Sequence, residues 1–360
     1  MRQFALRSHS APITYILPVL SSSLTRFVYT ADQQGYVIKW NLQVKRPDLQ
    51  WQAHTDSILT ILEWDQYIIT HSRDSTIRIW LDDEKCYEVP VNALNFSNIV
   101  MFNNRYLITP ATLDSNNMDV YELTKDPIAI TRVLANFGAY KLVNTTGLHY
   151  RAKRDSEATS TTDDDADVNV KGRKDFGIIM KMLLINKTVY IGFESGDIIG
   201  LIMEFSETLG ARFTLAYHNT THCPNPVISL ANVEDTLISG STSNKLVYHH
   251  KPVKIVPYPQ SGIQAIIPYN DDLIIGFWDG SIEYKGQIIQ RDLPHLRADD
   301  DDNTKTVLKL TFMSLLPVTT SKSENQLARG KYAMMIKKSI ETDLLLAGYE
   351  DGTILAFSIT

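Results

Sequence analysis

Cysteine is scarce in this sequence, since Cys86 and Cys223 are the only two. Without a Cys-x-x-Cys pair, the sequence predicts neither a disulfide framework nor a zinc site, and it favours a reducing compartment. It also lacks any run of about 18 or more apolar residues, which argues against a transmembrane helix. Residues 1–9 contain no apolar core of a signal peptide, so no secretory leader is expected.

An excess of basic residues is also missing. The net charge is −6 and the isoelectric point is about 5.9. Direct nucleic-acid binding is therefore not expected, because it requires clustered Lys and Arg. Catalytic motifs are missing too: Gly192 to Gly196 has the wrong spacing for a Gly-x-Ser-x-Gly nucleophile turn, and neither a phosphate-binding Gly-rich loop nor His-Glu-x-x-His occurs. The sequence predicts a protein that is not an enzyme and has no cofactor and no metal.

What the sequence does contain is a repeated unit, best preserved in residues 53–58 and 70–80. A histidine opens the unit, and alternating apolar residues follow. A tight turn with an aspartate comes next, then a β-branched strand that ends in tryptophan. The alternation has the period of a half-buried strand. The unit resembles a WD repeat, which is one blade of a β-propeller.

The repeats can be counted by marking one turn residue in each unit. This marker lies five positions before the last aromatic residue of the unit, or before the residue that replaces that aromatic residue. Most of these markers are separated by roughly the 40–45 residues of a WD blade. Two longer steps contain polar, acidic insertions at about 151–175 and about 297–340, which we expect to be disordered, with a strand near 307–316. The sequence predicts an all-β fold, a single seven-bladed propeller over 1–360. The markers are Gly35, Ser75, Asn116, Gly196, Ser243, Gly280 and Gly352.

The two ends of the sequence predict how the propeller closes. The chain stops after the third strand of blade seven, so that blade lacks an outer strand. Residues 3–7 form a short strand that belongs to no other blade. We expect this strand to pair with residues 354–359 and close the ring, because closure protects exposed strand edges.

Blade two contains the complete set of polar residues that form a buried network in the WD family. These residues are His54, Thr70 or Ser72, Asp74 and Trp80. A buried indole N–H and a buried imidazole each need a hydrogen-bond partner, which gives the set its physical sense.

The other blades contain only parts of this network. Blade one keeps His9 and Trp40, with Gln34 at the position of the aspartate. Blades six and seven keep the aspartate but not the tryptophan, and the residues at these positions are Asp279 and Lys285 in blade six, and Asp351 and Phe357 in blade seven.

The segment from His218 through His222 to Cys223 has a spacing that could suit a metal. Its Asn, Thr and Pro residues disfavour the helix that would place both histidines on one face. His222 also falls near the opening position of blade five, so a structural role is the preferred interpretation. The His249-His250 pair follows a strand and is expected in a turn at the blade edge.

Three charged segments have both a plain and a functional interpretation. Residues 299–302 are expected to be solvated, because they lack the alternating ligand pattern and the glycine of a calcium loop. Residues 162–165 could be a kinase site, against the plainer interpretation of a flexible loop. Residues 171–174 resemble a short nuclear-import signal, a pattern that occurs easily by chance.

Partner binding is expected on an exposed face of the propeller. Trp, Tyr and Arg dominate interface hot spots, although several of the candidates must belong to the core. The candidates are Tyr36, Trp51, Trp64, Arg73, Arg78, Trp278 and Tyr349.

Three stretches point beyond the general WD fold: residues 6–13, residues 90–96 and residues 346–354 with their Gly-Tyr-Glu-Asp-Gly. Their order resembles that of the ASTRA-associated protein 1 family. The resemblance implies a subunit of the nuclear ASTRA complex, which links chromatin remodelling to co-chaperones that mature phosphatidylinositol-3-kinase-related kinases. It further implies Tel/Tti-type co-chaperones, AAA+ ATPases and a kinase-related subunit as partners. We expect a monomer within a hetero-complex, located in the nucleus and also allowed in the cytoplasm.

Two alternative functions remain open. One is a substrate receptor of a cullin-type ubiquitin ligase, which often has Trp-Asp-x-Arg, whereas here Asn41 and Leu81 follow the tryptophans. The other is a propeller hydrolase or lyase, which would need titratable groups on the inner strands. Inner-strand segments such as 58–62 and 227–230 contain none. Fold alone does not decide among these functions.

Overall fold

The structure is a computed structural model that describes residues 3–19, 26–92, 96–146, 175–206, 210–291, 308–317 and 342–359. The segments 162–165, 171–174 and 299–302 lie outside these residues, as does most of each predicted acidic insertion. None of the described helices is long and apolar enough to cross a membrane.

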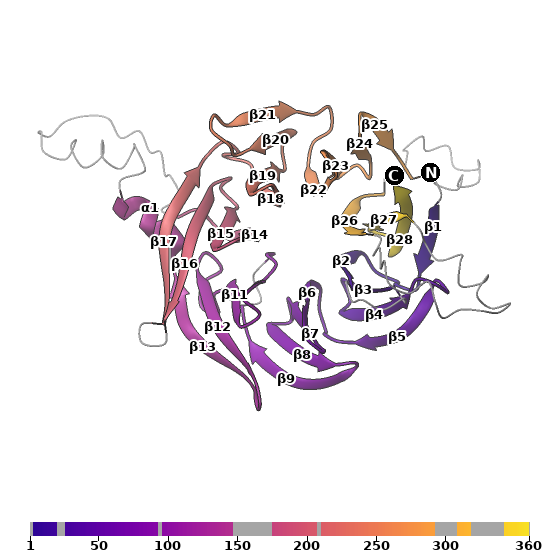
Figure 1. The fold of residues 1–360 in the computed structure, drawn as a ribbon, viewed down its shortest axis with the longest axis horizontal. Helices are drawn as coiled ribbons and strands as arrows, with labels where there is room; N and C mark the ends of the chain where they lie inside the picture. The colour runs from indigo at the N-terminus through magenta and orange to yellow at the C-terminus, as the bar shows by residue number, and fades with distance from the viewer. Residues whose placement is uncertain are drawn as a thin grey trace, which may run out of the picture. The chain divides into compact units, whose positions relative to one another are not determined.

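Within the described residues, the strands form seven four-stranded antiparallel sheets. Each sheet is one blade, and the chain has the predicted fold of a seven-bladed β-propeller (Figure 1). The chain comprises two compact units. The first consists of Met1–Glu88 together with Gln260–Thr360, and the second of Val89–Pro259. A single domain over 1–360 stays a prediction.

The first unit contains blades six, seven, one and two. The strands of blade one are β2 (Ile13–Pro18), β3 (Phe27–Asp32), β4 (Tyr36–Asn41) and β5 (Arg46–Gln52). Those of blade two are β6 (Ile58–Trp64), β7 (Tyr67–Ser72), β8 (Thr76–Leu81) and β9 (Glu84–Pro90). Those of blade six are β22 (Ile263–Tyr269), β23 (Asp272–Phe277), β24 (Ile282–Tyr284) and β25 (Gln287–Ile289). Those of blade seven are β26 (Leu310–Leu316), β27 (Asp343–Tyr349), β28 (Thr353–Ile359) and β1 (Gln3–Arg7).

The second unit contains blades three, four and five. The strands of blade three are β10 (Val100–Phe102), β11 (Tyr106–Pro110), β12 (Met118–Lys125) and β13 (Ile128–Phe137). Those of blade four are β14 (Ile179–Ile185), β15 (Thr188–Phe193), β16 (Ile198–Ser206) and β17 (Gly210–Asn219). Those of blade five are β18 (Val227–Val233), β19 (Thr236–Ser241), β20 (Lys245–Tyr248) and β21 (Lys254–Pro257).

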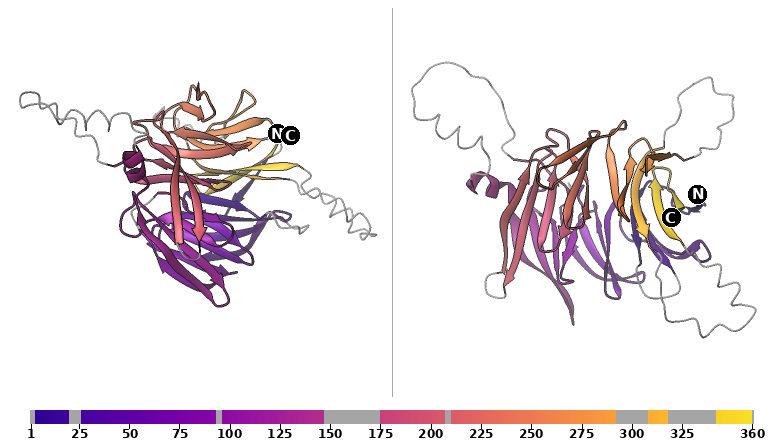
Figure 2. Two further views of the ribbon diagram at one scale, coloured as in Figure 1. Left: turned by 60° about the vertical axis from the view of Figure 1, so that its left-hand side comes forward. Right: turned by 45° about the horizontal axis from the view of Figure 1, so that its top comes forward.

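One helix accompanies the strands in the part of the chain that the structure describes, and the strand alternation of the sequence does not predict it. Helix α1 (Ala139–Thr146) follows β13 directly and lies beside β16 and β17 (Figures 1 and 2). Its buried Ala139 and Val143 belong to the same apolar cluster as Leu201 and Phe213. The helix therefore covers apolar surface on blade four.

The predicted closure by the N-terminal strand is confirmed. β1 pairs antiparallel with β28, with Gln3 opposite Phe357 and Arg7 opposite Thr353. Leu6 is buried, and it packs in one cluster with residues of blades seven and one, among them Ile354. The apolar cores thus lie between neighbouring blades, and β1 completes the sheet of blade seven.

Two local features repeat from blade to blade. In five of the seven blades, the turn between the second and third strand holds a residue with positive φ, as at Gly35, where φ is +85°. A Cβ there would lie 2.1 Å from the carbonyl oxygen of His54, so glycine is required. Each inner strand of the first unit also contains a β-bulge one residue after its start, at Thr14 in blade one for instance. Bulges of this kind redirect a side chain.

Candidate functional site

The polar network predicted in blade two is assembled in the structure. Trp80 Nε1 donates to Thr70 Oγ1 at 2.8 Å, and His54 Nε2 lies 2.7 Å from the same hydroxyl oxygen. His54 Nδ1 lies 2.9 Å from Asp74 Oδ2. Because the carboxylate can only accept, Nδ1 carries the proton and Nε2 accepts from Thr70. Thr70, not Ser72, is the bridging hydroxyl, while Ser72 donates to the carbonyl oxygen of Asp56.

Electrostatics keep this network in one protonation state. Burial lowers the pKa of His54, and the hydrogen bond to Asp74 only partly opposes that effect. Burial alone would raise the pKa of Asp74, but the hydrogen bonds from His54 and Thr76 outweigh it and hold that pKa well below its usual range. A neutral imidazole therefore bridges the turn and the second strand, which makes the network a structural brace of the blade.

Blade one contains the same brace, and here the sequence interpretation of Gln34 was wrong. His9 Nδ1 lies 2.7 Å from Asp32 Oδ2, and both His9 Nε2 and Trp40 Nε1 contact Thr30 Oγ1. Asp32 stands at the end of β3, and its Oδ1 accepts from the backbone N–H of Gln34 at 2.9 Å. The Gln34 side chain is exposed. The carboxylate of this brace belongs to Asp32, two positions before Gln34, because position 32 also lies beside the histidine.

Blade five contains a variant of the brace. Counting five positions forward from the marker Ser243 misses the last residue of this brace by one position. His222 Nε2 and His249 Nε2 lie 2.7 Å and 2.6 Å from Ser239 Oγ. The backbone N–H of His249 donates to the carbonyl oxygen of Leu237, so His249 occupies the position of the tryptophan rather than a turn at the blade edge. Burial lowers the pKa of His222 to about 4 and that of His249 to about 3.

The histidine pair with metal-like spacing is divided between two networks. His222 belongs to the brace of blade five, whereas His218 Nε2 lies 2.8 Å from Asp197 Oδ1 in blade four. Cys223 Sγ also contacts Asp197, and burial together with that carboxylate raises the pKa of the Cys223 thiol to about 12. In the parts of the chain that the structure describes, no group of three or more His, Cys, Asp or Glu residues could hold a metal ion.

In blades six and seven, the aspartate stabilises its own turn. Asp279 and Asp351 each accept from the backbone N–H two residues later, as Asp74 accepts from Thr76. In blade seven, Arg291 binds Asp351 through two parallel contacts of 2.9 Å and 2.8 Å. No feature of the sequence marked Arg291, because an arginine after a strand is indistinguishable from a solvated charge.

The candidate interface residues fall into two groups. Trp51, Trp64 and Tyr349 are buried, and Arg78 pairs with Glu88. Trp278 is 40% exposed, the highest value among the tryptophans of the chain, all of which are described. It is therefore the aromatic candidate for a contact with a partner.

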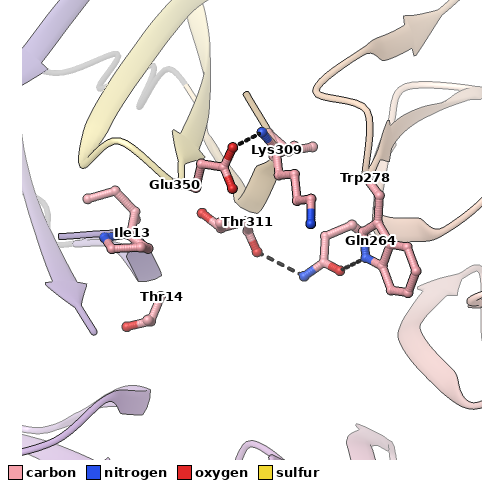
Figure 3. A pocket seen from close by; sticks show the side chains of 9 residues that line it. Ile13, Thr14, Gln264, Trp278, Lys309, Thr311 and Glu350 are labelled. Carbon is pink, nitrogen blue, oxygen red and sulfur yellow. Dashed lines mark hydrogen bonds between the residues drawn. The ribbon is translucent and has the colours of Figure 1, made fainter. Parts of the chain in front are cut away.

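Trp278 lines an open pocket of about 460 Å³ in the first unit (Figure 3). The bulge residues of three inner strands line it as well: Thr14 in β2, Gln264 in β22 and Thr311 in β26. This pocket could not be predicted from the sequence, because a bulge is not visible in an alternating pattern. The bulge positions bring three polar residues to one place in the pocket.

The four-stranded blades and their His-Asp-Trp braces define the class of this protein, a WD-repeat β-propeller. A family model described as ASTRA-associated protein 1 matches residues 2–357 of the chain. The chain therefore belongs to the ASTRA-associated protein 1 family, as its sequence motifs suggested.

Relatives with that name cover the chain almost completely. The ASTRA-associated protein 1 of Lodderomyces elongisporus is 49% identical over 395 residues, which cover 99% of this chain and 98% of that protein. The protein of the same name from Candida tropicalis is 41% identical, with 99% of each chain covered. The crystal structure of the computationally designed Ika8 protein matches with a TM-score of 0.52 at 12% identity, covering 99% of this chain and 98% of that one, which shows the fold alone.

Proposed function

We propose that this protein is a non-enzymatic scaffold subunit of the ASTRA complex in the nucleus. The observation that carries the proposal is the family match over residues 2–357, together with relatives that bear the name over 99% of the chain. A β-propeller is a fold typical of rigid scaffolds. The buried histidines and aspartates of the blade braces are paired with one another, which fits a structural role for them.

The proposed role within the complex is to connect chromatin remodelling with the co-chaperone-assisted maturation of phosphatidylinositol-3-kinase-related kinases. The proposed neighbours are Tel/Tti-type co-chaperones, AAA+ ATPases and a kinase-related subunit. In this role the protein acts as one copy that presents binding surfaces. No catalytic chemistry is assigned to it, because similarity of fold does not by itself establish chemistry.

The test is affinity purification of the tagged full-length chain from a nuclear extract at moderate salt, with quantification by mass spectrometry. Near-equal amounts of the co-chaperone and kinase-related subunits are expected. Cullin and its adaptors in their place would support a ubiquitin-ligase receptor instead. A chain that purifies alone would contradict both scaffold roles.

A further inference from the structure

The pocket beside Trp278 presents a fixed aromatic face. Trp278 Nε1 donates to Gln264 Oε1 at 2.8 Å, and the Trp278 backbone N–H donates to the carbonyl oxygen of Gly262 at 3.0 Å. The indole ring covers Gly262 so closely that a Cβ there would lie 2.3 Å from it. The ring is therefore held in place before any ligand arrives, and such preorganisation lowers the entropic cost of binding.

Gln264 connects this aromatic face to the next blade. Its Nε2 donates to the carbonyl oxygen of Thr311 at 2.9 Å while its Oε1 accepts from Trp278 (Figure 3). Both hydrogen-bonding atoms of the amide are thus used inside the protein. The amide is a support for the indole, which leaves ligand recognition to other groups of the pocket.

One charged group of the pocket is open to a ligand. The ammonium group of Lys309 has no hydrogen bond or ion pair with a described residue, and its side chain extends toward Gln264 (Figure 3). The hydroxyl oxygen of Thr14 has no hydrogen-bond partner within the described ranges either, but it is buried and therefore not open to a ligand.

The carboxylate of Glu350 is already partly occupied. Its Oε1 accepts from the backbone N–H of Lys309 at 3.0 Å, and the Glu350 backbone N–H donates in turn to the carbonyl oxygen of Lys309. These two bonds fix the segment that carries Lys309. The ammonium of Lys309 is therefore the charge of the pocket that a ligand can neutralise.

We propose that this pocket binds an extended peptide segment of a protein partner, with an acidic side chain next to a large apolar one. The acidic group pairs with Lys309, and the apolar group lies on the indole of Trp278. A nucleotide fits less well, because Lys309 is the single basic lining residue and Glu350 repels phosphate. This inference rests on the proposed scaffold function and names one surface through which it would act.

The test starts with selection from a displayed library of random 12-residue peptides on the purified full-length chain. Enriched peptides are then measured by fluorescence polarisation. We expect an acidic residue within two positions of a large apolar one. Trp278→Ala should weaken binding at least about tenfold, as for an aromatic hot spot. Lys309→Gln should weaken it about threefold, as for an exposed ion pair.

Two variants serve as controls. Lys309→Arg keeps the charge and should retain binding, and Leu81→Ala removes an apolar side chain that is 41% exposed outside the pocket. Both should bind as the unmodified chain does, and the thermal midpoints of all variants show whether they fold. Enrichment of basic peptides, or binding that survives Trp278→Ala, overturns the proposal.

The same variants separate this inference from the proposed function. If the unmodified chain co-purifies with ASTRA subunits and the Trp278→Ala, Lys309→Gln double variant does so equally, the pocket assignment is wrong and the scaffold function stands. If the unmodified chain co-purifies with none of them, the scaffold function is wrong, and the display result then decides the pocket by itself.

Discussion

Arg291 binds Asp351 at the position where His54 binds Asp74 in blade two. Arg291 lies two residues after β25, and His54 lies two residues after β5. The guanidinium contacts both carboxylate oxygens, lies 3.3 Å from Thr353 Oγ1 and stands over the ring of Tyr349. Blade seven therefore has the brace between its opening segment and its turn, built from different residue types.

This relationship predicts that Arg291→Ala destabilises blade seven. A two-pronged contact between Arg and a carboxylate is stronger than a simple ion pair, and Asp351 is partly exposed, so the expected cost is about 1 kcal/mol. Arg291→Lys keeps the charge but cannot contact both carboxylate oxygens in parallel, so it should recover less than half of the lost stability. Urea unfolding of these variants and of Asp351→Asn, combined in a double-mutant cycle, measures the coupling. Additive effects of the two substitutions would show that the pair contributes nothing.

A second prediction concerns the carboxylate of blade one. Asp32→Ala should cost about 1–3 kcal/mol, because it leaves the buried Nδ1 of His9 without an acceptor. Gln34→Ala should change the free energy of unfolding by less than about 0.5 kcal/mol, since that side chain is exposed. Chemical unfolding of the two variants side by side compares them. If both substitutions cost the same, His9 does not depend on Asp32.

The third prediction is that Asp74→Ala costs about 1–3 kcal/mol, because Nδ1 of His54 is then buried without a partner. Asp279→Ala is the matched control in blade six. Asp279 is exposed and accepts only from Ser281 within the described residues, so its loss should cost well under about 1 kcal/mol. Thermal unfolding followed by circular dichroism gives both midpoints. An unchanged midpoint for Asp74→Ala would contradict the brace.

The sequence predicted most of the architecture, and particular residues show why it did not predict all of it. The strand alternation and the turn glycines are local, so the seven blades and the pairing of β1 with β28 could be foreseen. Asp32 and Arg291 act through tertiary contacts with residues more than twenty positions away, and a local pattern carries no such information. The pocket depends on bulges at Thr14, Gln264 and Thr311, which alternation does not reveal.

The turn glycines give a fourth prediction with an internal control. Gly280 and Gly286 have φ values of +81° and +73°. A Cβ on Gly280 would lie 2.2 Å from the carbonyl oxygen of Leu308, whereas a Cβ on Gly286 would meet nothing within 4 Å. Gly286→Ala should cost about 1 kcal/mol from backbone strain alone, and Gly280→Ala about 2–4 kcal/mol, because the clash is added to the strain. Equal costs in urea unfolding would show that the turn of blade six can move away from Leu308.

The last prediction concerns acid and rests on His71 in β7. The ring is fully buried, and neither nitrogen has a hydrogen-bond partner among the described residues. Burial lowers the pKa of His71 to about 3, against roughly 6.5 in an unfolded chain. The unfolded chain therefore binds a proton that the folded chain does not between these two values. The resulting stability is present above the unfolded pKa and is lost as pH falls toward the folded pKa.

Between pH 7 and pH 5, His71 alone should account for a loss of about 2 kcal/mol in the free energy of unfolding. Ordinary carboxylates do not titrate in that range, and Asp74, with its lowered pKa, begins to matter only below about pH 4. His71→Phe should therefore reduce the difference in unfolding free energy between pH 7 and pH 5 by this amount. The effect of the substitution on stability at pH 7 does not enter this comparison. His250→Phe is the control, because His250 is exposed and should leave the difference unchanged. An equal pH dependence in both variants would mean that the imidazole of His71 is protonated in the folded chain, and thus that the ring has a partner or reaches water.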